Sequence, residues 1–102
     1  MGIRKSMEEE LVVSEERDEW LEKCENSLNN QGFKKVEANN SLYQVKGNYK
    51  KFTVWGEILI TLKPHSEKNT NIFIKATSNV DNIYALFKSP NKTIIEKFKK
   101  GL

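Results

Sequence analysis

The chain has 102 residues, of which 37% are hydrophobic and 30% are charged, which suits one domain with a thin core and excludes a deep multilayer body. Its 17 basic and 14 acidic side chains give a net charge of +3, with residues 1–31 net acidic and residues 32–102 net basic. Apolar runs such as Leu11–Val13 and Ile58–Ile60 are far too short for a membrane-spanning helix, and the single cysteine, Cys24, excludes an internal disulfide.

The N-terminal third predicts a strand followed by a helix. Residues 1–7 are expected to be a flexible N-terminus, residues 8–102 are expected to form a single α+β domain, and residues 10–13 read as a short strand. Ser14 is a favourable N-cap for a helix that follows, and Gly32 is placed to end it with a Schellman cap. One apolar stripe runs along that helix at helical spacing: Trp20, Leu21, Cys24 and Leu28.

Four strand segments follow the helix. Residues 33–38 and 41–47 flank Asn39-Asn40, a pair that suits a tight hairpin turn. Residues 52–63 show the clearest alternation, residues 64–69 predict a polar turn, and a partner strand follows. The side chains predicted to face the core from these last two strands are Phe52, Val54, Ile58, Ile60, Leu62, Ile72, Ile74 and Ala76.

The C-terminal segment predicts a second long helix. Asp81 is a candidate cap for a short turn carrying Ile83, Leu86 and Phe87, and Ser89-Pro90 is a strong helix start. Ile94, Ile95 and Phe98 then form the buried stripe, and Gly101 ends the helix. The predicted fold is a curled antiparallel α+β sheet in the order β-α-β-β-β-β-α, with two helices packed on one face.

If both helices cover one face of the sheet, the other face is the candidate contact surface. It should carry the odd-numbered side chains of the two clearest strands, because neighbouring side chains on a strand point to opposite faces. Exposed aromatic and aliphatic side chains on such a face favour contact with another molecule. The candidate binding residues are Thr53, Trp55, Leu59, Phe73 and Lys75.

Two stretches resemble a group of small, uncharacterised bacterial domains. They are Lys46-Gly47 through Phe52-Thr53-Val54-Trp55-Gly56-Glu57-Ile58 and Asn91-Lys92-Thr93-Ile94-Ile95-Glu96-Lys97-Phe98. The chain departs from the group's pattern at Lys88-Ser89-Pro90, where those domains carry an aromatic-glycine pair. The resemblance implies an architecture similar to one half of the TATA-box-binding-protein fold. It implies no activity, because a shared architecture does not determine function.

The residues predict no catalytic centre. His65 is the only histidine and lies in a charged turn, and Cys24 lies on the apolar stripe, where burial makes a thiol inert. Glu8-Glu9-Glu10 point in alternating directions and suit no metal cage. We therefore expect a protein that is not an enzyme, with no cofactor and no metal. The free cysteine and the lack of a secretory-type segment favour a cytoplasmic protein. The richness in Lys, Asn and Ile is typical of an AT-rich bacterial or phage genome.

Three classes of partner remain open on these grounds. The first, and the one we predict, is an interaction domain that binds itself, as a homodimer, or a protein partner through the Trp55, Leu59 and Phe73 face. The second is nucleic acid, stacked on that basic and aromatic face, although arginine is scarce there. The third is a small apolar ligand or lipid between the sheet and the helix, or a peptide added to an edge strand. No membrane association is expected.

Overall fold

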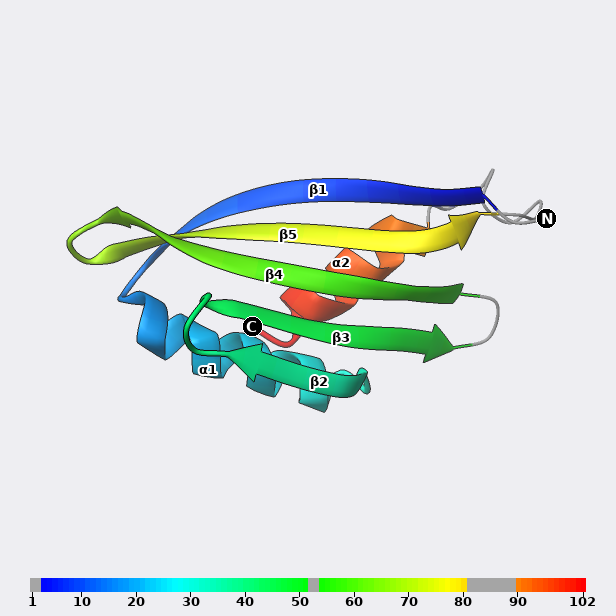
Figure 1. The fold of residues 1–102 in the computed structure, drawn as a ribbon, viewed down its shortest axis with the longest axis horizontal. Coiled ribbons are helices and arrows are strands. Elements are labelled where there is room, and N and C mark those ends of the chain that lie inside the picture. Colours follow the sequence, from blue (N-terminus) through cyan, green and yellow to red (C-terminus); the bar gives the residue numbers. More distant parts are fainter. Residues whose placement is uncertain (1–2, 52–53, 81–89) are drawn as a thin grey trace.

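A computed structural model describes residues 3–51, 54–80 and 90–102 as five strands and two helices. The elements in chain order are β1 (Ile3–Ser14), α1 (Arg17–Asn30), β2 (Lys34–Asn39), β3 (Gln44–Lys51), β4 (Val54–Ser66), β5 (Asn69–Val80) and α2 (Pro90–Lys100). The strands form one open antiparallel sheet in the order β1-β5-β4-β3-β2 (Figure 1). This confirms the predicted class, the element order and the antiparallel sheet.

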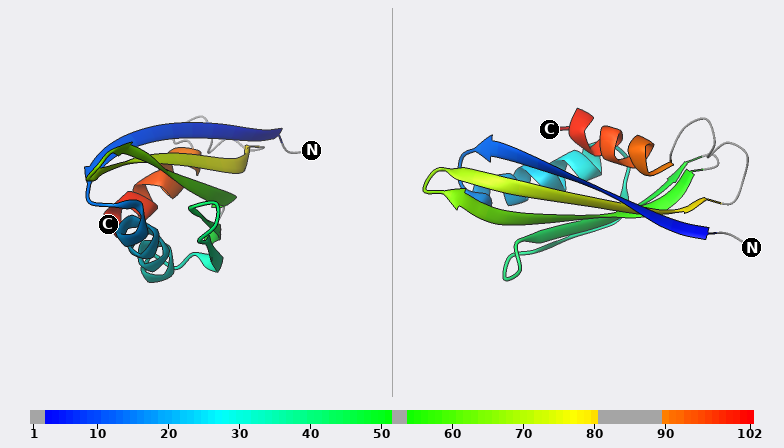
Figure 2. Two further views of the ribbon diagram at one scale, coloured as in Figure 1. Left: turned by 60° about the vertical axis from the view of Figure 1, so that its left-hand side comes forward. Right: turned by 90° about the horizontal axis from the view of Figure 1, so that it is seen from above.

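Both helices lie on the same side of the curved sheet (Figure 2). Alternation along the strands then decides which side chains form the core, because every second residue faces the helices. On β4 these are Ile58, Ile60 and Leu62, each at most 1% exposed. Other buried members of the core, taken from β5 and both helices, are Ile72, Ile74, Ala76, Leu21, Cys24, Leu28, Ile94, Ile95 and Phe98. The predicted division into a covered face and an open face is confirmed.

Helix α1 ends as its sequence predicts. Gly32 has a φ of +85°, the left-handed conformation that glycine adopts without steric cost. The Phe33 N–H donates to the Leu28 carbonyl at 3.0 Å and the Gly32 N–H donates to the Asn29 carbonyl at 3.3 Å. This pair of hydrogen bonds is the Schellman motif.

The start of α1 differs from the prediction. Ser14 stays in β1, paired with Asn69, and the chain turns at Glu15, whose φ is +85°. Thr70 Oγ1 donates to the Glu15 carbonyl at 2.9 Å. Glu16 is then the N-cap residue, without a side-chain cap hydrogen bond. Ser14 is not the cap because the sheet already holds its backbone.

Strand β1 is also longer than predicted. It begins at Ile3 rather than at Glu10, and its register with β5 runs from Ile3 opposite Val80 to Ser14 opposite Asn69. Residues 3–7 therefore belong to the sheet and not to a flexible N-terminus. The sequence pattern does not predict this extension because the side chains of residues 3–7 are largely polar. Strand pairing with the long β5 nevertheless satisfies the backbone hydrogen-bonding groups there, whatever the side chains are.

The hairpin turns are placed differently from the prediction as well. The β2–β3 connection spans residues 40–43, and Asn39 Oδ1 accepts the N–H groups of Ser41 and Leu42, each at 3.0 Å. Such a side-chain turn replaces the expected two-residue hairpin turn. Strand β4 continues to Ser66, so the polar turn shrinks to residues 67–68. Residues 52–53 lie outside the described residues.

Helix α2 begins at Pro90 and buries Ile94, Ile95 and Phe98, as predicted. The two helices meet at their C-terminal ends, where buried Ser27 Oγ donates to the Phe98 carbonyl at 2.6 Å. The predicted cap at Ser89 and the predicted turn at residues 81–87 lie outside the described residues. Within the described ranges, neither helix has the length and apolar content needed to cross a membrane.

Candidate functional site

The open face of the sheet carries a row of charged side chains that is symmetric about Leu59. Leu59 on β4 lies between Lys75 on β5 and Lys46 on β3. Beyond these lysines the register places Glu8 on β1 and Glu37 on β2. Lys46 forms an exposed ion pair with Glu37 at 3.3 Å. Among the residues that the structure describes, Lys75 forms no ion pair.

A hollow of about 450 Å³ lies over this row on the β1 side, and we call it the Leu59 hollow. Leu59 and Phe73 supply its apolar surface, and both are only partly exposed. Thr61 lies opposite Phe73, and the Lys63 ammonium lies 5.2 Å from the centre of the Phe73 ring. The full lining consists of Glu8, Glu9, Glu10, Leu59, Thr61, Lys63, Phe73, Ile74 and Lys75.

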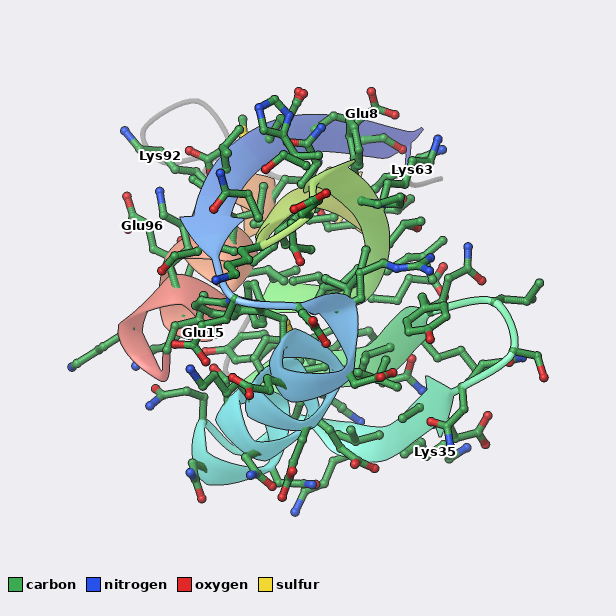
Figure 3. The ribbon with its side chains drawn as sticks, turned by 90° about the vertical axis from the view of Figure 1, so that its left-hand side faces the viewer. Glu8, Glu15, Lys35, Lys63, Lys92 and Glu96 are labelled. Carbon is green, nitrogen blue, oxygen red and sulfur yellow. The ribbon has the colours of Figure 1, made fainter. Side chains whose placement is uncertain are left out.

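The charges around the Leu59 hollow are separated by strand. Glu8 and Glu10 stand on β1, opposite Lys75 and Phe73. Lys63 and Lys75 stand on β4 and β5. Figure 3 shows Glu8 and Lys63 on the side of the sheet away from α1. The hollow therefore has an apolar floor, an acidic wall on β1 and a lysine toward each end of the floor.

The structure brings three of the predicted binding residues together and separates a fourth. Leu59, Phe73 and Lys75 all line the Leu59 hollow. Trp55 is on the same face and 51% exposed, but it stands four residues along β4 from Leu59, a distance of roughly 13 Å at the rise of a strand. The Lys50 ammonium lies 4.7 Å from the centre of the indole ring. Thr53 lies outside the described residues.

Sequence reasoning missed the acidic wall. The predicted strand begins only at Glu10, and consecutive glutamates at residues 8–10 predict no shared surface. The alternation itself was the available signal, because on a strand Glu8 and Glu10 share one face. Glu9 takes the other face, where the Lys99 ammonium of α2 lies 3.1 Å from its carboxylate.

The space between the sheet and the helices is filled by side chains. Leu28, Val45 and Ile60, contributed by α1, β3 and β4, have no exposed surface. Phe33 and Tyr49 pack with their ring centres 5.1 Å apart at one side of this core. Interiors packed in this way leave little room for a bound ligand. The described packing therefore counts against the predicted ligand position between sheet and helix.

Cys24 and His65 are the two residues considered for catalysis. Burial raises the pKa of the Cys24 thiol to about 12, so the thiol stays protonated and unreactive at neutral pH. His65 is exposed near the end of β4 rather than in a turn. Neither residue lines the Leu59 hollow.

Comparison with known proteins identifies the fold. No family model matches the chain, and no curated protein matches it by sequence. Solved structures of norcoclaurine synthase from Thalictrum flavum do match. One, in complex with dopamine and hydroxybenzaldehyde, has a TM-score of 0.68 at 11% identity and covers 98% of this chain and 84% of its own. A truncated form has a TM-score of 0.65 at 11% identity and covers 98% and 91% of the two chains.

These matches correct two predictions. The resemblance to half of the TATA-box-binding-protein fold is wrong, because the matching structures have the Bet v1-like fold. The expectation that the chain is not an enzyme is corrected as well, because the structures that share its fold are those of a synthase and the fold gives no ground for excluding an enzyme. At 10–11% identity the likeness extends to the fold alone, so no catalytic residue is carried over. The chain has a small α+β domain of the Bet v1-like fold.

Proposed function

We propose that this protein binds a small, largely aromatic molecule carrying one acidic group in the Leu59 hollow. The observation that carries the proposal is the hollow itself, in which an apolar floor of Leu59 and Phe73 adjoins Lys63 and Lys75. Its volume of about 450 Å³ lies within the range of small-molecule sites. The fold supports the proposal, because norcoclaurine synthase has been solved with dopamine and hydroxybenzaldehyde, which are both small aromatic molecules.

The side chains suggest how such a molecule is held. An aromatic ring placed on Phe73 and Leu59 removes apolar surface from water, which is the main favourable contribution. Lys75 makes no ion pair within the described part of the chain, so its ammonium is available to an acidic group of the ligand. Glu8 and Glu10 on the acidic wall repel a second negative charge. A monoanion therefore fits better than a dianion.

A matched pair of fluorescent probes tests this proposal. 1-Anilinonaphthalene-8-sulfonate is an aromatic monoanion, and N-phenyl-1-naphthylamine has the same rings without the acidic group. We expect Phe73→Ala to weaken binding of both probes about tenfold, which corresponds to about 1.4 kcal/mol. Lys75→Gln should weaken binding of the sulfonate several-fold and leave the amine unchanged, because only the sulfonate uses the ammonium.

Val12→Ala is the matched control for these titrations. Val12 is an exposed apolar residue of the same open face, opposite Asn71 and outside the lining of the hollow. Its substitution should leave both dissociation constants unchanged. Equal affinities in the wild type, Phe73→Ala and Lys75→Gln would show that the hollow is not the site.

A protein partner is the second candidate, favoured by the half-exposed Trp55. A homodimer centred on Leu59 is less favourable, because a two-fold axis along or across β4 at Leu59 places lysine against lysine and glutamate against glutamate. Such like-charge contacts oppose association. Light scattering of the wild type and Trp55→Ala separates the cases: an unchanged monomer mass in both argues against self-association through the indole.

Nucleic acid is less well supported by the observed face. Glu8, Glu10, Glu37 and Glu57 all stand on the same side of the sheet as Lys46 and Lys75. Carboxylates at these positions oppose the phosphate backbone that dominates nucleic-acid affinity.

A further inference from the structure

The two edges of the sheet are built differently. Edge strand β2 has six residues, a register shift between Lys34 and Glu37, and a positive φ of 52° at Lys35. Edge strand β1 has twelve residues, no proline, and an unbroken register with β5 from Ile3 to Ser14. Short and irregular edges resist the addition of a further strand, whereas long and regular edges permit it. Of these two edge strands, only β1 has the geometry to accept a further strand.

The outer edge of β1 offers backbone hydrogen-bonding groups. In an antiparallel pair, part of each strand's N–H and C=O groups turn toward the neighbour and the rest turn away from it. Strand β1 pairs with β5 on one side, and within the described residues no strand lies on its other side. Figure 1 shows β1 as the arched strand at the top of the sheet. An extended segment of another protein can use these groups by strand addition.

The side chains of β1 define the chemistry of that segment. Glu8 and Glu10 stand on the open face, both exposed. Leu11 and Val13 stand on the covered face, where they pack partly against the core and keep some exposed apolar surface. A strand added at this edge meets the carboxylates of Glu8 and Glu10 on the open face. On the covered face it meets the apolar surface of Leu11 and Val13 beside Glu9, whose carboxylate is already paired with a lysine of α2. A segment in which basic and apolar residues alternate matches both faces, because successive side chains of a strand point to opposite faces.

A second copy of the chain does not meet these requirements. Two β1 edges paired through their centres would place the glutamates of one strand beside those of the other, and like charges on opposed strands are destabilising. The basic edge strand β2 has the irregularities described above, which prevent a continuous ladder. The complementary occupant is therefore a different protein.

We infer that the β1 edge binds an extended segment of a partner protein in which basic residues alternate with apolar ones. The backbone of β1 supplies the hydrogen bonds, and Glu8 and Glu10 select the basic side chains. This site shares Glu8 and Glu10 with the rim of the Leu59 hollow. It differs from ligand binding there because its hydrogen bonds come from the backbone edge of β1 rather than from the floor formed by β4 and β5.

The test uses a fluorescein-labelled seven-residue peptide that alternates Lys and Val. A second peptide carries N-methyl groups on alternate residues, which removes the N–H groups along one edge and retains the charge. A third has the same composition with its lysines and valines in two blocks. Fluorescence anisotropy should show binding of the alternating peptide, with at least tenfold weaker binding of the other two. Amide hydrogen exchange should slow in β1 and stay unchanged in β2.

Two charge-matched variants complete the experiment. Glu8→Lys combined with Glu10→Lys should weaken peptide binding at least tenfold. Glu22→Lys combined with Glu96→Lys changes the net charge equally at exposed positions of α1 and α2, and should have a much smaller effect. Circular dichroism verifies that both variants fold. Equal binding of the N-methylated peptide, or equal losses in the two variants, would overturn the inference whatever the outcome for the Leu59 hollow.

Discussion

The covered and open faces of β4 and β5 are made from the same strands and have opposite character. On the covered face Ile58, Ile60 and Ile74 are at most 1% exposed. On the open face Leu59 and Phe73 stand among lysines and glutamates and keep part of their surface in water. The comparison separates two groups of apolar side chains: those against the helices hold the fold together, and those on the other face keep surface that, under the proposed function, contacts a ligand.

Removal of the α2 phenylalanine that packs against the covered face should have the largest effect on stability. Phe98 is fully buried between α2 and the core. Phe98→Ala should lower the free energy of unfolding by about 3–5 kcal/mol, because it leaves a cavity that the neighbours fill only in part. Urea denaturation followed by circular dichroism measures this loss. A loss below about 1 kcal/mol would mean that the covered face is not the main source of stability.

Substitution of a β-strand glycine next to the core should have a smaller effect on stability, and a second such glycine provides a matched control. A Cβ atom at Gly56 would lie 2.5 Å from the Thr77 backbone oxygen and 2.8 Å from Ile94. Gly56→Ala should therefore destabilise the fold by about 1–3 kcal/mol through overpacking. At Gly47 the nearest atom would be 3.4 Å away, so Gly47→Ala should be close to neutral. Equal effects in the same denaturation assay would contradict the close approach at Gly56.

Alkaline pH should lower stability through the buried thiol of α1. The pKa of Cys24 is raised from 9.0 to about 12 by burial. Above pH 9 the unfolded chain releases this proton while the folded chain keeps it, so stability falls as pH rises toward 12. Relative to Cys24→Ala, which lacks the group, the wild type should lose roughly 1.4 kcal/mol per pH unit above 9. Urea denaturation of both proteins at pH 8 and pH 10 measures the difference, and parallel pH dependence would contradict it.

Removal of a phenylalanine from the open face should have the smallest effect on stability. Phe73→Ala should cost about 1 kcal/mol or less, because the ring is only partly buried and its loss leaves no closed cavity. The same variant should weaken binding of the aromatic probes about tenfold. Together with Phe98→Ala it sharpens the comparison: a large loss of stability in Phe73→Ala would show that the open face also holds the fold together.

Much of the fold could be predicted where local chemistry and tertiary packing agree. The end of α1 at Gly32 needs a left-handed residue, and the start of α2 at Pro90 needs a fixed φ, so both boundaries are visible in the sequence. The alternation from Ile58 to Leu62 likewise predicted the covered face. It placed Leu59 on the open face for the same reason, since neighbouring side chains on a strand point in opposite directions.

Other features depended on partners distant in sequence. Residues 3–7 form a strand because β5 lies beside them, and Ser14 is not an N-cap because Asn69 holds it in the sheet. The register between strands, which no local pattern gives, brought Glu8, Lys75 and Leu59 into one row. The sequence by itself determined which side chains share a face of a strand, because that alternation is a property of the backbone. Only the tertiary structure decided which strands are neighbours, and with them the walls of the Leu59 hollow and the open edge of β1.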